Sequence, residues 1–125
     1  MSSGTGTSSA VVATGAAGAA VTMTLPAPAS GLRIYLDAVR IARHTSALLV
    51  AGATPTIITT TNLPGSLTYS IPTDAALAGT VYEKVDNGWG RLGLASSAQA
   101  TAVTFVAPAV TSTIWHMTAF YYVAP

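Results

Sequence analysis

Apolar and polar residues alternate along several short stretches of the chain, and a period of two is typical of half-buried β-strands. Val, Ile and Thr, which favour strands, are concentrated in these stretches. Clusters of Gly, Pro, Asn and Ser separate them at intervals typical of an all-β sandwich or barrel. The predicted strands are Ala20–Leu25, Leu32–Arg43, Thr56–Thr61, Leu67–Ile71, Thr80–Val85, Arg91–Ala95, Thr101–Ala107 and Thr113–Val123.

The longest of the early stretches, Leu32–Arg43, changes phase in the middle. Its apolar residues occupy even-numbered positions as far as Ala38 and odd-numbered positions from Val39 onward. A β-bulge near Ala38 would account for this shift of one residue. A helix over Tyr35–Ala42 is the competing interpretation, because part of the apolar spacing also fits a helix.

Turn residues support the same architecture. Asn62–Gly65 predicts a type II turn, in which Gly65 supplies the positive φ. Asn87-Gly88 is a hairpin signal between two predicted strands, and Ser46–Thr54 has no period and suits a loop that crosses between sheets. We therefore predict an antiparallel, jelly-roll-like β-sandwich with an extended N-terminal arm.

The N-terminal part of the chain differs from the rest. It is rich in Ser, Gly, Thr and Ala and contains no Lys or Arg, which predicts a flexible arm over residues 1–19 and a single domain over residues 20–125. Because small residues lose little side-chain entropy and can add a strand to another sheet, we expect Ser9–Ala20 to become ordered only against another chain. Ala10–Val21 is too short and too weakly apolar for a membrane span, and the missing basic residues exclude a secretory signal.

The last predicted strand has two unlike faces. One is uniformly apolar and suits a core, whereas the other mixes Ile, Phe and Tyr with His and Thr. A solvated sheet face should be polar. Either a loop or the arm covers this second face, or it is a subunit interface, where Tyr and Phe are enriched and charge is depleted. The core face is Trp115, Met117, Ala119, Tyr121 and Val123, and the second face is Ile114, His116, Thr118, Phe120 and Tyr122.

The chain carries very little charge. Of its 125 residues, five are Lys or Arg and four are Asp or Glu, and the formal net charge is +1. Charged residues thus make up 7% of the chain, against about 25% in typical soluble domains. This scarcity of charge favours a subunit interface on the last strand and a homo-oligomer, because a surface with so few charged groups must be solvated by Thr and Ser or covered by other protein. We expect no nucleic-acid partner and no membrane partner.

Residues for catalysis or metal binding are scarce. His44 and His116 fall in different strands without an acidic neighbour, and the chain has no Cys. Asp86-Asn87-Gly88 lacks the acidic residue that closes a calcium loop, and the N-terminal glycines lack a phosphate-binding Lys. The sequence therefore predicts no enzyme, no cofactor and no metal site.

A few side chains remain as candidates for contacts. Arg33, Arg40 and Arg43 lie in one segment, and we expect them to pair with acids of a neighbouring chain or to grip a partner surface. Trp89, at a predicted hairpin tip, either stacks on a sugar or, as we favour, folds over a sheet end or docks on another subunit. The predicted interface residues are Ile114, His116, Phe120, Tyr122, Arg33, Arg40 and Arg43, with Trp89 as a partner or glycan contact.

Three segments resemble small virion proteins of tailed bacteriophages: TIITTTNLPGS (Thr56–Ser66), AGTVYEKV (Ala78–Val85) and STIWHMTAFYYVAP (Ser112–Pro125). The resemblance implies a β-sandwich cement (decoration) protein, often trimeric, that binds the major capsid protein and stabilises the shell. Such a protein is made in the host cytoplasm and is located on the capsid surface of the virion. The alternative is a tail or baseplate component, or a receptor-binding (carbohydrate-binding) module.

Overall fold

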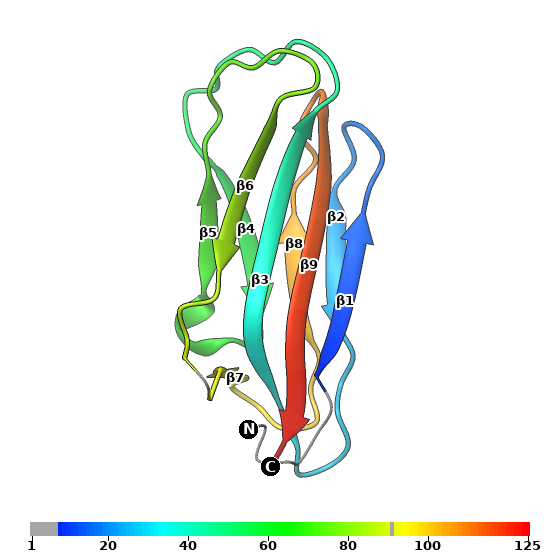
Figure 1. The fold of residues 1–125 in the computed structure, drawn as a ribbon, viewed down its shortest axis with the longest axis vertical. Coiled ribbons are helices and arrows are strands. Elements are labelled where there is room, and N and C mark those ends of the chain that lie inside the picture. Colours follow the sequence, from blue (N-terminus) through cyan, green and yellow to red (C-terminus); the bar gives the residue numbers. More distant parts are fainter. Residues whose placement is uncertain (1–7, 91) are drawn as a thin grey trace.

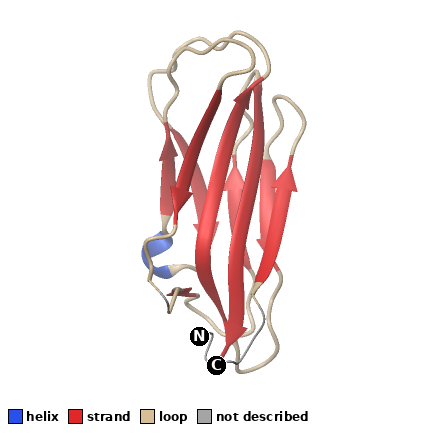
Figure 2. Ribbon diagram, viewed as in Figure 1, coloured by secondary structure: helices blue, strands red, loops and turns tan. Residues whose placement is uncertain are grey.

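The computed structural model describes residues 8–90 and 92–125, which form two antiparallel sheets packed face to face (Figure 1). Apart from strands, the described residues include one short 3-10 turn at Pro64–Ser66 (Figure 2). The predicted all-β sandwich is thus confirmed. The five-stranded sheet contains β1 (Ser9–Thr14), β9 (Thr113–Ala124), β3 (Arg33–Thr45), β6 (Val81–Asp86) and β7 (Leu94–Ala95); the four-stranded sheet contains β2 (Val21–Leu25), β8 (Val103–Ala107), β4 (Thr56–Thr61) and β5 (Thr68–Ile71).

The order of the strands is that of a jelly roll. Strands pair from the ends of the chain inward: β1 with β9, β2 with β8, β3 with β6 and β4 with β5. This long antiparallel hairpin then wraps so that β9 also pairs with β3, and β8 with β4. The resulting sheets, β1-β9-β3-β6 and β2-β8-β4-β5, are those of two Greek keys in a jelly roll.

The long strand β3 contains the predicted bulge. Its pairing with β9 shifts register between Leu36 and Ala38. Even-numbered residues point into the core up to Leu36, and odd-numbered residues do so from Val39 onward. The helix over Tyr35–Ala42 is therefore wrong, because the extended backbone there is held by strands on both sides.

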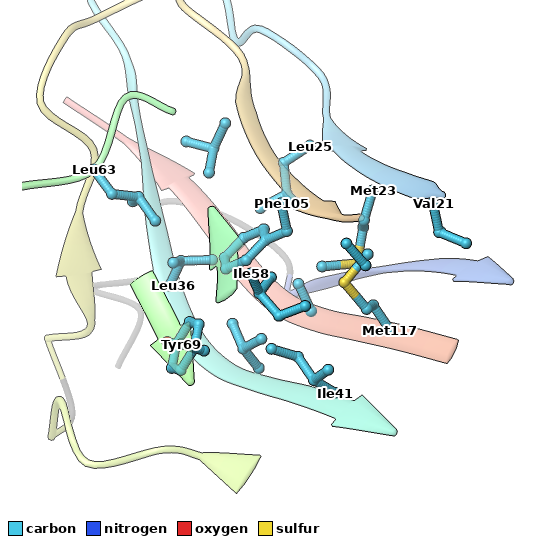
Figure 3. Packing of buried hydrophobic residues seen from close by; sticks show 14 of the residues in the cluster. Val21, Met23, Leu25, Leu36, Ile41, Ile58, Leu63, Tyr69, Phe105 and Met117 are labelled. Atoms are coloured by element: carbon cyan, nitrogen blue, oxygen red, sulfur yellow. The ribbon is translucent and has the colours of Figure 1, made fainter. Parts of the chain in front are cut away.

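The core lies between the two sheets, and both sheets contribute to it (Figure 3). Trp115 of β9 and Phe105 of β8 are its largest fully buried side chains. The Trp115 Nε1–H donates to the carbonyl oxygen of Pro108 at 2.9 Å, so the indole is buried with its polar group satisfied. The predicted core face of the last strand is confirmed, since its residues are buried up to Tyr121 and partly buried at Val123.

The N-terminal segment belongs to the sandwich from Ser9 onward. Ser9–Thr14 forms β1, which pairs with β9 of the same chain along its whole length. The expectation that Ser9–Ala20 orders only against another chain is wrong for these residues. Without β1, one side of β9 would be an edge with unpaired N–H and C=O groups, and β1 satisfies them. Residues 1–7 of the predicted arm lie outside the described residues.

The hairpin predicted at Asn87-Gly88 is also wrong. Within the described residues, β6 and β7 both pair with β3, and β7 continues along β3 beyond the point where β6 leaves it. β6 pairs with β3 from Val39 onward and β7 pairs with it up to Leu36, so the two strands lie on either side of the register shift of β3. Of the predicted strand Arg91–Ala95, only its last two residues form a strand, and Arg91 lies outside the described residues.

Candidate interaction surface

The outer face of the five-stranded sheet carries four of the eight side chains that the sequence predicted for contacts, Ile114, His116, Phe120 and Arg40. Alternate residues of β1, β9, β3 and β6 point away from the core, and cross-strand pairing brings them into rows. Phe120 of β9, for example, lies between Ala10 of β1 and Ala38 of β3. We call this surface the apolar face; its residues are Ala10, Val12, Thr14, Ala38, Arg40, Ala42, His44, Val81, Glu83, Val85, Ile114, His116, Thr118 and Phe120.

Large apolar side chains are exposed across the whole width of this face. Val12 on β1 and Val85 on β6 are each 56% exposed, and Phe120 and Val81 are each 47% exposed. Val12 and Val85 belong to the same row, with Thr118 and Arg40 between them. One alternative was that the N-terminal arm covers this face. Ser9–Thr14 of the predicted arm does not do so, because it forms β1, which lies beside β9 in the same sheet.

The charged groups of the apolar face neutralise each other. Arg40 of β3 forms an ion pair with Glu83 of β6, and both side chains are partly exposed. Next to this pair, His116 Nδ1 lies 2.5 Å from Thr14 Oγ1, so the imidazole is hydrogen-bonded to β1. His44 lies diagonally across from His116 on the neighbouring strand. Apart from these two histidines, the face carries one positive and one negative side chain, whose charges cancel.

Tyr122, predicted as an interface residue, is not available to a partner. It is 8% exposed, and its ring stacks on Tyr35 with 5.1 Å between ring centroids. Its hydroxyl donates to the carbonyl oxygen of Leu92 at 2.6 Å. Burial, followed by the nearby charge of Asp37, raises the pKa of Tyr122. The C-terminal end of β9 is thus covered by residues of the same chain, and the prediction that Tyr122 is an interface residue is corrected.

The three arginines do not form one cluster, because Arg40 and Arg43 lie on opposite sides of β3 and Arg33 lies at the other end of the strand. Arg40 lies on the apolar face, whereas Arg43 follows the inward phase and is only 3% exposed. The Arg43 guanidinium donates to the carbonyl of Pro72. Arg33 donates to the carbonyl oxygens of Ser96 and Ser97 at 2.8 and 2.7 Å. Arg33 and Arg43 therefore bind loops of their own chain, and of the three only Arg40 stays in the candidate interface.

Trp89 is partly buried and packs against the hydrophobic core. This agrees with the interpretation in which the ring folds over the end of a sheet. An exposed stacking platform for a sugar needs a free aromatic face, and the packing of Trp89 uses part of its ring.

The outer face of the four-stranded sheet has a different composition. Threonines pair across strands there, and the hydroxyls of Thr61 and Thr104 lie 2.7 Å apart. Ile57 is its only large apolar side chain among the strongly exposed residues, at 40%. We call this surface the threonine face; its residues are Thr22, Thr24, Ile57, Thr59, Thr61, Thr68, Ser70, Thr104 and Val106.

Outside these two faces, the described residues offer few groups that could form a binding or catalytic site. Residues 8–90 and 92–125 contain no group of three or more His, Asp or Glu that could hold a metal ion, and no pocket was found. None of the helical segments described is long and apolar enough to cross a membrane. Tyr69 donates to Asp86 Oδ2 at 2.9 Å, and burial together with this contact raises the pKa of Tyr69.

The fold and its surfaces define a class of protein, a jelly-roll β-sandwich with one apolar and one threonine-rich outer face. No protein-family model and no curated protein matches the chain. Among solved structures, the chain is similar to the K3 cleaved adhesin domain of Lys-gingipain from Porphyromonas gingivalis, with a TM-score of 0.36 and 12% sequence identity. The match covers 85% of this chain and 63% of that one. Such a weak likeness carries no argument about function.

Sequence reasoning missed the parts of the apolar face that lie on β1 and β6. Val12 fell in the predicted arm, where both alternate sets of residues are small and uncharged and the period of two is hidden. Val81 and Val85 alternate with polar residues on the strand Val81–Asp86, so their exposure on the outer face depends on which side of the strand meets the core. Only the pairing with β3 fixes that side.

Proposed function

We propose that this protein is a structural component of a tailed-phage virion, a cement (decoration) protein that binds and stabilises the shell of the major capsid protein. In this proposal it acts as a homo-oligomer, trimeric by its resemblance to such proteins, and it works by burying surface. It performs no chemical reaction. The observation that carries the proposal is the apolar face, an exposed sheet surface whose one ion pair is already neutralised within the chain.

Charge is the first argument. Five basic and four acidic residues serve an accessible surface of 6172 Å², which is the area that a compact monomer of this mass exposes, about 6200 Å². A typical domain of this length carries about thirty charged residues. Of the few here, Arg40 is paired with Glu83, and Arg43 is buried beside Asp74. Such a surface suits a subunit that is covered by other protein.

The second argument is the position of the exposed apolar side chains. These side chains belong to four strands that are hydrogen-bonded to one another, so their backbone is fixed before any partner binds; they are Val12, Phe120, Val81 and Val85. Burying the exposed half of one such side chain contributes about 1 kcal/mol. Because the side chains are already fixed on a sheet, little of this is lost to ordering on association. Repetition of identical contacts over a symmetric shell adds avidity.

The fold is compatible with this role but does not specify it, since jelly rolls occur in viral capsid proteins and also in lectins and cupins.

The proposal is tested with particles assembled without this protein. We expect them to rupture at a lower temperature than complete particles, and added protein to restore the rupture temperature.

Two variants separate a specific contact from a general effect of added protein. The Phe120→Asp variant, which places a charge on the apolar face, should fail to restore the rupture temperature. The Thr22→Asp variant, which places the same charge on the threonine face, should restore it. Particles that are equally heat-resistant with and without the protein would contradict the proposed function.

A further inference from the structure

The segment that follows β6 contains the dipeptide Asn87-Gly88, which forms no hairpin and has no part in the proposed function. It lies outside the strands, toward the end of the sandwich that is lowest in Figure 1. Both residues are exposed. An exposed Asn-Gly pair outside a strand is the setting in which an asparagine side chain can react with its own main chain.

That reaction brings the main-chain nitrogen of the following residue onto the side-chain carbonyl carbon, Cγ, of the asparagine. It therefore requires an asparagine side chain that can turn back and a nitrogen that can be approached. A following glycine favours both, because it has no Cβ beside the nitrogen and allows the widest range of φ and ψ. A hydrogen-bonded nitrogen in a β-ladder, in contrast, is held in one position.

Little holds Asn87 and Gly88 in one geometry. Among residues 8–90 and 92–125, the Asn87 side chain has no hydrogen-bond partner, and the Gly88 N–H donates only to Asp86 Oδ1, at 3.4 Å. This distance exceeds that of an ordinary N–H···O bond, which is about 2.7–3.2 Å. The Gly88 nitrogen is therefore open to attack on the neighbouring amide.

Asn62, the other asparagine of the chain, is held by several hydrogen bonds. Its Oδ1 accepts from the Ala98 N–H at 2.7 Å, and its Nδ2 donates to the carbonyl oxygens of Thr101 at 3.1 Å and Ala98 at 3.4 Å. Its main-chain carbonyl accepts from the Ser97 N–H at 3.0 Å. The residue that follows, Leu63, is 5% exposed. The chain thus holds one restrained and one unrestrained asparagine.

We propose that Asn87-Gly88 is a site of spontaneous deamidation, at which Asn87 becomes isoaspartate or aspartate without an enzyme. The Gly88 nitrogen attacks Asn87 Cγ, the bond from Cγ to Nδ2 breaks, and ammonia leaves with the proton that the Gly88 nitrogen carried. Water then opens the succinimide ring. Breaking the bond from the ring nitrogen to the main-chain carbonyl carbon of Asn87 leaves isoaspartate, and breaking the bond to Cγ leaves aspartate.

The product differs from the original chain in charge and in main-chain length. A carboxylate replaces an amide, and this negative charge cancels the formal net charge of +1. In isoaspartate the main chain runs through the former side chain, which lengthens the link between β6 and Trp89, whose ring packs against the core. The reaction is thus a slow, irreversible change in a chain with few charges, and it is independent of the proposed function.

Peptide mapping of the purified full-length chain by mass spectrometry, after incubation at neutral and mildly alkaline pH, tests the site. We expect Asn87 to deamidate at least about tenfold faster than Asn62, whose hydrogen bonds must break first. The rate at Asn87 should rise with pH, because the attacking nitrogen has to lose its proton. An isoaspartyl methyltransferase should label the Asn87 peptide. Equal rates at the two asparagines, or no product at Asn87, would overturn the inference.

The Gly88→Ala variant tests the role of the glycine in a loop that keeps its shape. A Cβ at Gly88 would have Asp86 Oδ1 as its nearest neighbour, at 3.9 Å, and the φ of Gly88 lies outside the left-handed region. Alanine therefore fits, and we expect deamidation to slow at least about fivefold. The matched control, Asn87→Gln, should give no acidic species on ion exchange. An unchanged rate in Gly88→Ala would overturn the inference.

The chain unfolded in urea provides the rate of each asparagine without the fold. Unfolding should accelerate deamidation at Asn62 at least about tenfold and change the rate at Asn87 by less than about threefold. If Asn87 reacts at least about tenfold more slowly in the folded chain than in urea, the fold keeps the amide away from Gly88, and the inference is overturned.

Discussion

The two outer faces of the sandwich differ more than their shared architecture requires. Both are antiparallel sheets with one side on the same core, yet the apolar face exposes Val12, Val85 and Phe120, and the threonine face exposes mainly hydroxyls. Threonine satisfies both requirements of a solvated sheet without charge, because it favours strands and bonds to water. The difference teaches that low charge alone does not mark an interface: one uncharged face is built for water, and the other is the candidate interface.

The largest effect is expected from charge placed on the two faces in turn. Phe120→Asp should weaken self-association by roughly a hundredfold or more, because association would bury an unpaired carboxylate. Thr59→Asp, the matched change on the threonine face, should leave the association constant within about threefold. Analytical ultracentrifugation of the two variants measures this. Equal effects of the two substitutions would abolish the distinction between the faces.

Two arginines of one strand provide the next comparison, because Arg43 points inward and Arg40, three positions away, points outward. Arg43→Ala should lower the free energy of unfolding by about 2–4 kcal/mol, since it removes a buried side chain and leaves the Pro72 carbonyl without its donor. Arg40→Ala removes a partly exposed ion pair and should cost less than about 1 kcal/mol. Urea denaturation measures both; similar losses would mean that Arg43 is solvated.

Alkaline pH tests the edge where the two sheets meet. Burial and the contact with Asp86 raise the pKa of Tyr69, so the folded chain keeps a phenolic proton that the unfolded chain loses near pH 10. The free energy of unfolding should therefore be level up to about pH 9 and fall above about pH 10. Tyr69→Phe should cost about 1 kcal/mol at neutral pH and reduce the alkaline fall, leaving the part due to Tyr122. An unchanged alkaline slope in the variant would show that Tyr69 is exposed to water.

The smallest effect is expected from removing hydroxyls on the threonine face. Thr24→Val keeps the shape of the side chain and the strand propensity, so stability should change by no more than about 0.5 kcal/mol. Self-association through the apolar face should not change. Solubility, measured as the protein concentration at which precipitation begins, should fall, because a second outer face has become more apolar. An increase in specific oligomer size would instead assign an interface to this face.

Local alternation made much of the fold predictable. The bulge in β3, the core face of β9 and the change of sheet after β3 depend on residues that are neighbours in sequence, and each was predicted correctly. The pairing of β1 was not predictable in the same way. Ser9–Thr14 pairs with residues more than a hundred positions away, and a strand of small uncharged residues gives little sign of which side is buried.

The candidate site was predicted only in part, for two physical reasons. The three arginines were grouped because they are close in sequence, although the phase shift at Ala38 already places Arg43 with the inward residues and Arg40 with the outward ones. Residues 46–53 and 72–79 are rich in Ala and Gly and have no strong strand propensity. The bridge that joins them, between Leu49 and Ala76, is therefore not visible in the sequence.

The central claim is that the apolar face is a contact between copies of this chain. Light scattering coupled to size exclusion, on the purified wild-type chain over a dilution series, tests it most directly. The account predicts a molar mass that is a multiple of the 12.5 kDa chain and falls toward a single chain on dilution or in the Phe120→Asp variant. A single-chain mass at every concentration, unchanged by Phe120→Asp, would contradict it.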